Sequence, residues 1–171
     1  IKFTGVFHGF KLTQDITIDG DAQFDCSTLS LNGNTLTIEG DLTQIGGTID
    51  TTSGTLNVKG NYDLLADLKN TGSIYSVINV SNDFLMENGN VNLNNVTINV
   101  ANNTIQTGGR MYVNGGELNV NGSYEVSSTG YLDFRGAGNV DVGKDFTIKT
   151  SKSAQASSTV NGSGWLFSDG T

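Results

Sequence analysis

The sequence predicts an all-β protein, a single-stranded right-handed parallel β-helix (β-solenoid) with a repeat of about 20 residues per coil and roughly 7–8 coils. Apolar–polar–apolar triplets open at Ile16, Leu36, Leu56, Ile78, Ile98, Leu118 and Val140. The position numbers of successive triplets differ by 20, 20, 22, 20, 20 and 22, and Val160 continues the series. A glycine or asparagine also recurs shortly after most triplets. A fixed period of this size is typical of stacked repeats.

An antiparallel β-sandwich is the main alternative, because it also has short strands joined by Gly and Asn turns. A sandwich does not require equivalent positions to recur at a fixed spacing through seven cycles, so the period favours the solenoid. A left-handed β-helix would favour hexapeptide units, and the longer coil therefore indicates the right-handed form.

The ends of the chain differ from its middle. Residues 1–14 carry three Phe and lack the triplet pattern, and we expect them to form a capping or lead-in segment over the exposed strand edges of the first coil. The solenoid is expected over residues 15–171, with a last coil or cap at about 151–171. Because the chain starts without Met and stops within an apparent repeat, we interpret it as a piece of a larger protein.

Each repeat is expected to contain three short strands. The triplet is a period-2 strand with one buried face. The corner after it holds Gly20, Gly40, Gly60, Asn82, Asn102 and Gly122, and these residue types tolerate positive φ. A second strand has the inward pairs Ala22/Phe24, Tyr62/Leu64, Phe84/Met86, Tyr124/Val126 and Phe146/Ile148. A third strand has the inward pairs Leu29/Leu31, Val91/Leu93, Met111/Val113 and Leu132/Phe134.

Two coils are longer than the others. The two larger steps place short insertions in the coils that start at Leu56 and Leu118. We expect both insertions in loops, because a loop can bulge without breaking the stack of strands.

Composition and charge exclude several classes of function. The net charge is −8 and the pI is about 4.3, so the surface repels phosphate backbones and lacks the basic stripe of a nucleic-acid-binding protein. No apolar run is long enough to span a bilayer, so no membrane insertion is expected. Disorder is the other reading of a polar composition, but the regular apolar positions argue against it. Cys26, the single cysteine, is interpreted as a small buried hydrophobe.

Three segments resemble repeats of known proteins: TLTIEGDLTQIGGTID (residues 35–50), GTLNVKGNYDL (54–64) and GGELNVNGSYEV (115–126). They look like repeats of large bacterial surface and secreted β-solenoid proteins, including filamentous haemagglutinin-type adhesins and the repeat regions beside some polymorphic toxins. The resemblance covers roughly residues 15–150. It implies a non-enzymatic bacterial protein, extracellular or on the cell surface, that acts in adhesion or displays another domain. It carries no functional residues over to this chain.

Stacking would turn sequence columns into rows on the surface. The outward residues of the first strands are Thr17, Thr37, Asn57, Asn79, Asn99, Asn119 and Asp141. The four consecutive Asn are predicted to form a ladder whose side-chain amides bond from coil to coil. Such a row also suits sugar hydroxyls or ordered water.

A carboxylate cluster is expected near the N-terminal corner. Asp19, Asp21, Glu39 and Asp41 would crowd two neighbouring coils, and oxygen-rich clusters suit Ca²⁺. The competing interpretation is that corner aspartates bind the N–H groups of the turns. Apart from this candidate calcium site, no cofactor is expected.

The third strands of two neighbouring coils predict a candidate ligand-binding patch. Arg110 and Tyr112 are expected to point outward from one coil, with Tyr131, Asp133 and Arg135 pointing outward from the next. These side chains offer forked donors, an acceptor and flat apolar faces, a combination that suits a pyranose ring. The alternative is cross-coil pairing of charged and aromatic neighbours, worth about 0.2–1 kcal/mol per pair.

The sequence has no catalytic signature. The single His8 lies in the expected cap, and there is no phosphate loop or dinucleotide fingerprint. We therefore expect a non-catalytic adhesive, carbohydrate-binding or stalk module whose partner is a polysaccharide or a host or cell-surface glycan. The alternatives are a subunit that self-associates end to end into fibres and a polysaccharide lyase or hydrolase, which the fold alone does not establish.

Overall fold

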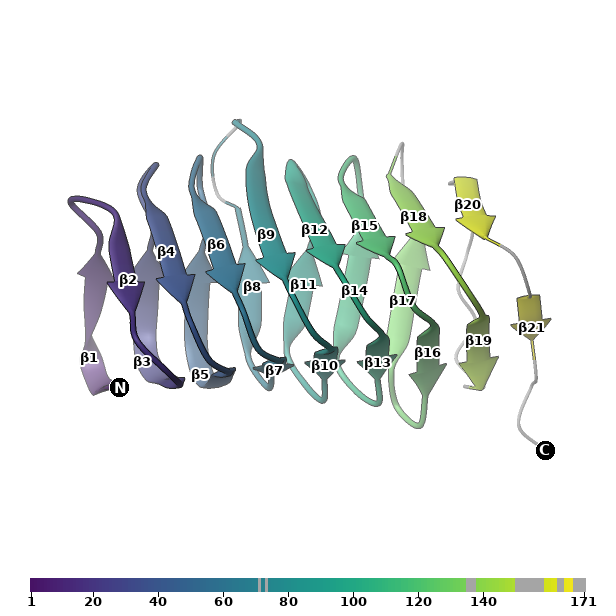
Figure 1. Ribbon diagram of the computed structural model, residues 1–171, viewed down its shortest axis with the longest axis horizontal. Coiled ribbons are helices and arrows are strands. Elements are labelled where there is room, and N and C mark those ends of the chain that lie inside the picture. The colour runs from purple at the N-terminus through teal and green to yellow at the C-terminus, as the bar shows by residue number, and fades with distance from the viewer. Residues whose placement is uncertain (71, 73, 135–137, 150–158, 163–164, 168–171) are drawn as a thin grey trace.

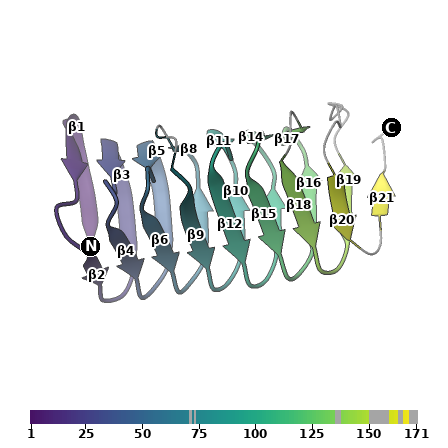
Figure 2. The same ribbon diagram turned by 90° about the horizontal axis from the view of Figure 1, so that it is seen from above.

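The chain forms a β-solenoid in the computed structural model, which describes residues 1–70, 72, 74–134, 138–149, 159–162 and 165–167. Every regular element in these residues is a strand, and the sheets are parallel throughout. The chain descends through the front strands, ascends through the back strands and advances from left to right (Figure 1), a right-handed path. β1 lies at one end of the stack and β21 at the other (Figure 2). The predicted fold class is confirmed.

The front sheet is built from the apolar triplets. Its eight strands, in order, are β2 (Ile16–Ile18), β4 (Thr35–Ile38), β6 (Thr55–Val58), β9 (Ser76–Val80), β12 (Val96–Val100), β15 (Glu117–Val120), β18 (Asn139–Val142) and β20 (Thr159–Gly162). Each triplet pairs with the equivalent triplet of the next coil, as Ile98 does with Leu118. Both apolar residues are buried in the triplets that open at Leu36 to Val140, because side chains alternate along a strand, whereas Ile16 in the first triplet is 37% exposed.

The second sheet, of 13 strands, branches. Its first strands are long: β1 (Lys2–Lys11), β3 (Ala22–Ser30) and β5 (Leu42–Asp50). β5 then pairs with both β7 and β8, so the sheet divides into two arms. The corner arm is β7 (Tyr62–Leu64), β10 (Phe84–Met86), β13 (Thr104–Gln106), β16 (Tyr124–Ser127), β19 (Phe146–Lys149) and β21 (Trp165–Phe167). The back arm is β8 (Asp67–Lys69), β11 (Asn90–Asn92), β14 (Arg110–Val113) and β17 (Tyr131–Phe134).

The three-strand coil predicted from sequence therefore holds from β6 to β17 and fails in the first coils. There the second and third strands run together through a bulge, at which the pairing of β3 with β5 shifts register between Phe24 and Thr28. Gln44 pairs with Leu64, whereas Thr48 pairs with Asp67, so the spacing between partners falls from 20 to 19 along β5. The coil that contains β7 is thus shorter by a single residue at this point, and the strand breaks there into two.

The N-terminal segment forms the first strand of the stack. β1 lies parallel to β3 and pairs Phe3 with Phe24 and Phe10 with Leu29, with a shift in register between Gly5 and Gly9. Phe3 also packs against the buried core. The segment is a lead-in strand because its apolar residues meet those of the next coil. At the other end β21 pairs with β19 and continues the stack.

One continuous core runs along the axis. The predicted inward positions of the second and third strands are buried, apart from half-buried Ile148, and Phe134 lies outside the residues whose side chains are described. Aromatic rings stack between coils in the corner arm, with centroids 5.4 Å apart for Tyr62 and Phe84 and 5.1 Å apart for Tyr124 and Phe146. Such stacks add stability beyond the area they bury.

The two long coils keep their strands in register, so the loop prediction is confirmed where it can be followed. Leu56 pairs with Ile78 and Leu118 pairs with Val140, which are the equivalent positions of the next triplets. In the first case the extra chain lies between β8 and β9. In the second, Arg110 pairs with Tyr131 at a spacing of 21, so a single extra residue lies in the turn before β17.

Two different constraints favour glycine in the corner column, namely positive φ at Gly20 and lack of space at Gly40. Gly20 has a φ of 84°, in the left-handed region. At Gly40 the limit is space, because a Cβ atom there would lie 2.2 Å from Oδ1 of Asp21 and 2.7 Å from the carbonyl carbon of Gly20. The predicted positive φ is therefore not the general rule in this column, since close coil-to-coil approach excludes a side chain at Gly40.

The asparagine ladder forms as predicted on the outer face of the front sheet. Nδ2 of Asn79, Asn99 and Asn119 donates to Oδ1 of the preceding Asn at 2.9, 2.9 and 3.0 Å. Nδ2 of Asn57 donates to Oγ1 of Thr37 at 3.4 Å. Each ladder amide thus fixes the register of two coils.

We expect Asn99→Ala to lower the free energy of unfolding by about 1–2 kcal/mol, because it deletes one ladder bond on each side. Urea denaturation measures the change. Asn94→Ala, in an exposed turn, is the control and should cost less than about 0.5 kcal/mol. Equal losses in the two variants would contradict a stabilising role for the ladder.

Two buried threonines should respond to substitution by valine with opposite signs. Oγ1 of Thr104 is buried with no hydrogen-bond partner among the described residues, and Thr104→Val should stabilise the protein by about 1 kcal/mol. Oγ1 of Thr51 lies 2.9 Å from Oγ of Ser76, and Thr51→Val should cost about 1–2 kcal/mol. Thermal or urea unfolding tests both, and a loss of stability in Thr104→Val would contradict the first expectation.

Candidate functional site

The candidate site lies on the outer face of the back arm. In-register pairing places Asn90, Arg110 and Tyr131 in one row across β11, β14 and β17. Tyr112 and Asp133 are neighbours in the next outward row. The structure therefore brings together four of the five patch residues predicted from sequence. The fifth, Arg135, lies outside the described residues.

Glycines in the turns before β11 and β14 position the row formed by Asn90, Arg110 and Tyr131. Gly89 and Gly109 have φ of 78° and 66°, a region that favours glycine. The carbonyl of Gly89 accepts a hydrogen bond from N–H of Arg110 at 2.8 Å, and the carbonyl of Gly109 accepts one from N–H of Tyr131 at 3.0 Å. Each turn thus sets the start of the next coil's strand.

Arg110 is held by two tyrosines. Its guanidinium carbon lies 5.1 Å from the centroid of the Tyr131 ring, a cation–π contact, and its Nη1 donates to the hydroxyl of Tyr112 at 3.3 Å. The hydrogen bond to Tyr112, together with the nearby Tyr131 and Asp133, raises the pKa of the Arg110 guanidinium above its ordinary value. Arg110 is therefore a permanent, exposed and positioned cation.

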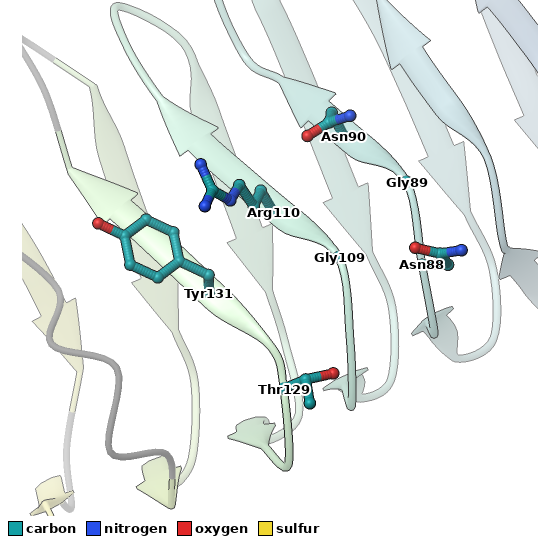
Figure 3. Close-up of a pocket in the computed structure, with 7 residues that line it drawn as sticks. All are labelled: Asn88, Gly89, Asn90, Gly109, Arg110, Thr129 and Tyr131. Atoms are coloured by element: carbon teal, nitrogen blue, oxygen red, sulfur yellow. The ribbon is translucent and has the colours of Figure 1, made fainter.

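A shallow, open groove of about 270 Å³ surrounds this arginine (Figure 3). It is lined by residues of three successive coils: Asn88, Gly89, Asn90, Gly109, Arg110, Thr129 and Tyr131. In Figure 3 the side chains of Asn90, Arg110 and Tyr131 lie side by side on their strands, while Asn88 and Thr129 lie at the turns. The groove offers amides, a hydroxyl, a guanidinium and an aromatic ring within one surface.

A neighbouring carboxylate is already engaged. Oδ1 of Asp67 accepts hydrogen bonds from the backbone N–H of Asn90 at 2.9 Å and from its Nδ2 at 3.0 Å. This pair fixes the orientation of the Asn90 amide at the edge of the groove. Asp67 itself is not a lining residue.

A buried polar pair supports the groove from inside the solenoid. Nε2 of Gln106 donates to the carbonyls of Gly109 at 3.3 Å and Tyr131 at 3.1 Å, and Oε1 accepts from the hydroxyl of Tyr124 at 2.7 Å. Burial raises the pKa of the Tyr124 hydroxyl, so it stays a donor. These bonds fix the backbone at Gly109, which precedes Arg110 in the chain, and at Tyr131, which pairs with Arg110 in the next coil.

The same device occurs once more among the described residues, away from the groove. Nε2 of Gln44 donates to the carbonyls of Gly47 at 3.5 Å and Asp67 at 2.8 Å, and Oε1 accepts from the hydroxyl of Tyr62 at 2.6 Å. Gln44 and Gln106 are both fully buried. The buried Gln–Tyr pair is therefore a structural feature of the solenoid corner, and one of its two copies among the described residues lies beneath the groove.

Asp133 lies on the outer face opposite Tyr112, yet only 1% of its surface is exposed. An outward position in a sheet is open to solvent only where neighbouring side chains leave it uncovered. Asp133 contributes negative charge near Arg110 and does not line the groove.

Sequence reasoning missed Asn88, Asn90, Thr129 and the buried Gln106. Asn90 stands one coil before Arg110 and could have been found by extending the column. Thr129 lies in the turn that carries an inserted residue, so its column position was hidden. Gln106 resembles any strand residue in sequence, because its role depends on a corner that forms only when coils stack.

The predicted calcium cluster does not assemble. Among the described residues, no three His, Cys, Asp or Glu side chains are grouped so as to hold a metal ion, and this covers Asp19, Asp21, Glu39 and Asp41. Oδ1 of Asp21 instead accepts from the N–H of Asp41 at 2.9 Å, and Oδ1 of Asp41 accepts from the N–H of Asn61 at 2.6 Å. Each of these two corner carboxylates thus binds the backbone of the next coil.

A second groove, of about 230 Å³, follows the asparagine ladder. Its lining includes Asn79, Asn99, Asn119 and Asn121. The ladder amides are already bonded to each other along this groove. Its described lining contains no charged side chain and is less specific in its chemistry than the groove at Arg110.

Comparison of the chain with protein-family models, curated proteins and solved structures finds no match. The part of the chain that the structure describes includes no helix with the length and apolar character needed to cross a membrane.

Replacing Tyr124 or Tyr62 by Phe should lower the free energy of unfolding by about 1–2 kcal/mol each, because a buried glutamine oxygen loses its donor. Tyr112→Phe, which removes a hydroxyl at the surface, should cost less than about 0.5 kcal/mol. Urea denaturation compares the three variants. If Tyr112→Phe costs as much as the buried pair, the support assigned to the glutamines is wrong.

Proposed function

We propose that the chain is a non-catalytic, extracellular module of a bacterial surface or secreted protein, in which a rigid solenoid presents a carbohydrate-binding groove around Arg110 and Tyr131. The observation that carries the proposal is the convergence of a guanidinium, two amides, a hydroxyl and an aromatic ring from three coils on one open groove. Adhesion to a polysaccharide or a cell-surface glycan would be its biological use.

The chemistry of the lining supports a saccharide ligand. Sugar hydroxyls donate and accept hydrogen bonds, and so can the amides of Asn88 and Asn90. The hydroxyl of Thr129 donates to the carbonyl of Thr107 at 3.3 Å and can still accept a hydrogen bond from a sugar. The half-buried Tyr131 offers an apolar wall with a polar end. An open groove along several coils suits an extended chain better than a small molecule, which is usually enclosed.

The rigidity of the scaffold supports a binding role. The groove rests on in-register strands, on the turns at Gly89 and Gly109 and on the buried Gln106. A site whose backbone is fixed loses little conformational entropy when a ligand binds.

The lining also supports a non-catalytic role. Its described residues are Asn, Gly, Arg, Thr and Tyr, and they do not include the pair of carboxylates that glycoside hydrolysis commonly uses.

A glycan array tests this proposal. The wild-type protein should bind a saccharide, and Tyr131→Ala should weaken that binding by about tenfold or more, because it removes the ring beneath Arg110 and one wall of the groove. Tyr112→Ala should weaken it less, because Tyr112 holds Arg110 without lining the groove.

Tyr75→Ala is the matched control, since Tyr75 is 60% exposed and lies outside the groove. It should leave binding unchanged. Binding that survives both Tyr131→Ala and Tyr112→Ala would show that the saccharide binds elsewhere.

A further inference from the structure

The groove differs in charge from the rest of the molecule. The chain carries 17 Asp and Glu against 9 Lys and Arg. Among the described residues that line the groove, only Arg110 is charged, and it is a cation. The nearest carboxylate in its row, Asp67, is bonded to Asn90. A positive site is therefore set into an acidic surface.

Arg110 is positioned as a donor whose capacity is largely unused. A guanidinium has five N–H groups, and the hydrogen bond that described residues give Arg110 uses one of them, at Tyr112. The Tyr131 ring, with its centroid 5.1 Å from the guanidinium carbon, contacts this group without accepting its hydrogens in a conventional bond. Within the described part of the chain, Arg110 forms no ion pair.

These features together indicate the charge of the ligand. A guanidinium whose fork is oriented and unpaired binds a planar or tetrahedral oxyanion through two parallel hydrogen bonds. The buried carboxylate of Asp133 lies near Arg110 but does not line the groove. An anionic substituent would pair with the guanidinium from the solvent side, whereas a neutral sugar offers it no charge. Elsewhere the acidic surface repels a polyanion, so an anionic ligand would be confined to the groove.

We propose that the groove recognises the anionic substituent, a carboxylate or a sulfate ester, of an acidic saccharide. The Arg110 fork binds the anion, while the amides of Asn88 and Asn90 and the hydroxyl of Thr129 bind ring hydroxyls. This proposal rests on the proposed function, because it names the class of saccharide that the same groove takes.

Acidic oligosaccharides and their neutral counterparts test the proposal. Isothermal titration calorimetry would compare oligogalacturonate with its methyl ester, oligomannuronate with its methyl ester, and a sulfated galactan oligomer with its desulfated form. At least one acidic member should bind about tenfold or more tightly than its neutral counterpart, and raising the salt concentration should weaken it. The member that binds tells whether the anion is a carboxylate or a sulfate.

Variants at Arg110 assign the effect to the groove. Arg110→Gln should reduce affinity for the acidic member about tenfold or more and remove its advantage over the neutral form. Arg110→Lys keeps the charge but loses the fork, and should retain part of that advantage. Lys149→Gln removes a cation that pairs with Glu125 outside the groove, and it should leave the affinity for the acidic member unchanged. Circular dichroism would check that each variant is folded.

The outcomes separate the two proposals. If neutral forms bind as well as acidic ones, and Arg110→Gln leaves binding unchanged while Tyr131→Ala weakens it, the anionic ligand is wrong and the carbohydrate-binding function stands. If no member of the panel or of the glycan array binds, both proposals are wrong. An acidic preference that Arg110→Gln retains would place anion recognition outside this groove and overturn the inference.

Discussion

The structure depends on one constraint, which is that each coil must present its hydrogen-bonding groups in register with the coil before and after it. Parallel strands about 4.8 Å apart satisfy the backbone in this way. The same register satisfies outward side chains: Asn99 bonds to Asn79, and the carboxylate of Asp41 bonds to the N–H of Asn61. A shift of a single residue would break both sets of bonds and turn the apolar triplets outward. The register therefore explains why equivalent positions carry equivalent residues.

This regularity also explains why function is to be sought where the pattern changes. In the ladder, side-chain amides bond to their equivalents in the next coil, and at the corner carboxylates accept from backbone N–H groups of the next coil, so these polar side chains retain little unused hydrogen-bonding capacity. At Arg110 the column changes from an amide to a guanidinium and then to an aromatic ring at Tyr131. These three side chains cannot form a ladder of identical bonds, so they leave donors and an aromatic surface open to a ligand. The inserted residue before β17 accompanies this change.

Buried hydrogen bonds inside the solenoid hold the backbone of the groove in place. Gln106 and Tyr124 form a buried polar pair that bonds to the backbone of two coils, at Gly109 and at Tyr131. An equivalent pair, Gln44 and Tyr62, supports a corner without a groove. The Gln–Tyr pair is thus a structural feature of the repeat, and at Gln106 it also supports the backbone next to Arg110. A buried network of this kind is stabilising because every member finds a partner.

The sequence by itself determined the solenoid, its inward columns and the asparagine ladder, because side-chain alternation and in-register stacking are periodic rules that a single repeat already obeys. It also brought Arg110, Tyr112 and Tyr131 to one face. Only the tertiary structure decided that the first coils fuse two strands, that Asp133 is covered, that the corner carboxylates accept from backbone N–H groups of the next coil, and that Asn88, Asn90 and Thr129 join the groove. These outcomes depend on the shapes of turns and on the reach of side chains between coils, and neither property follows a period.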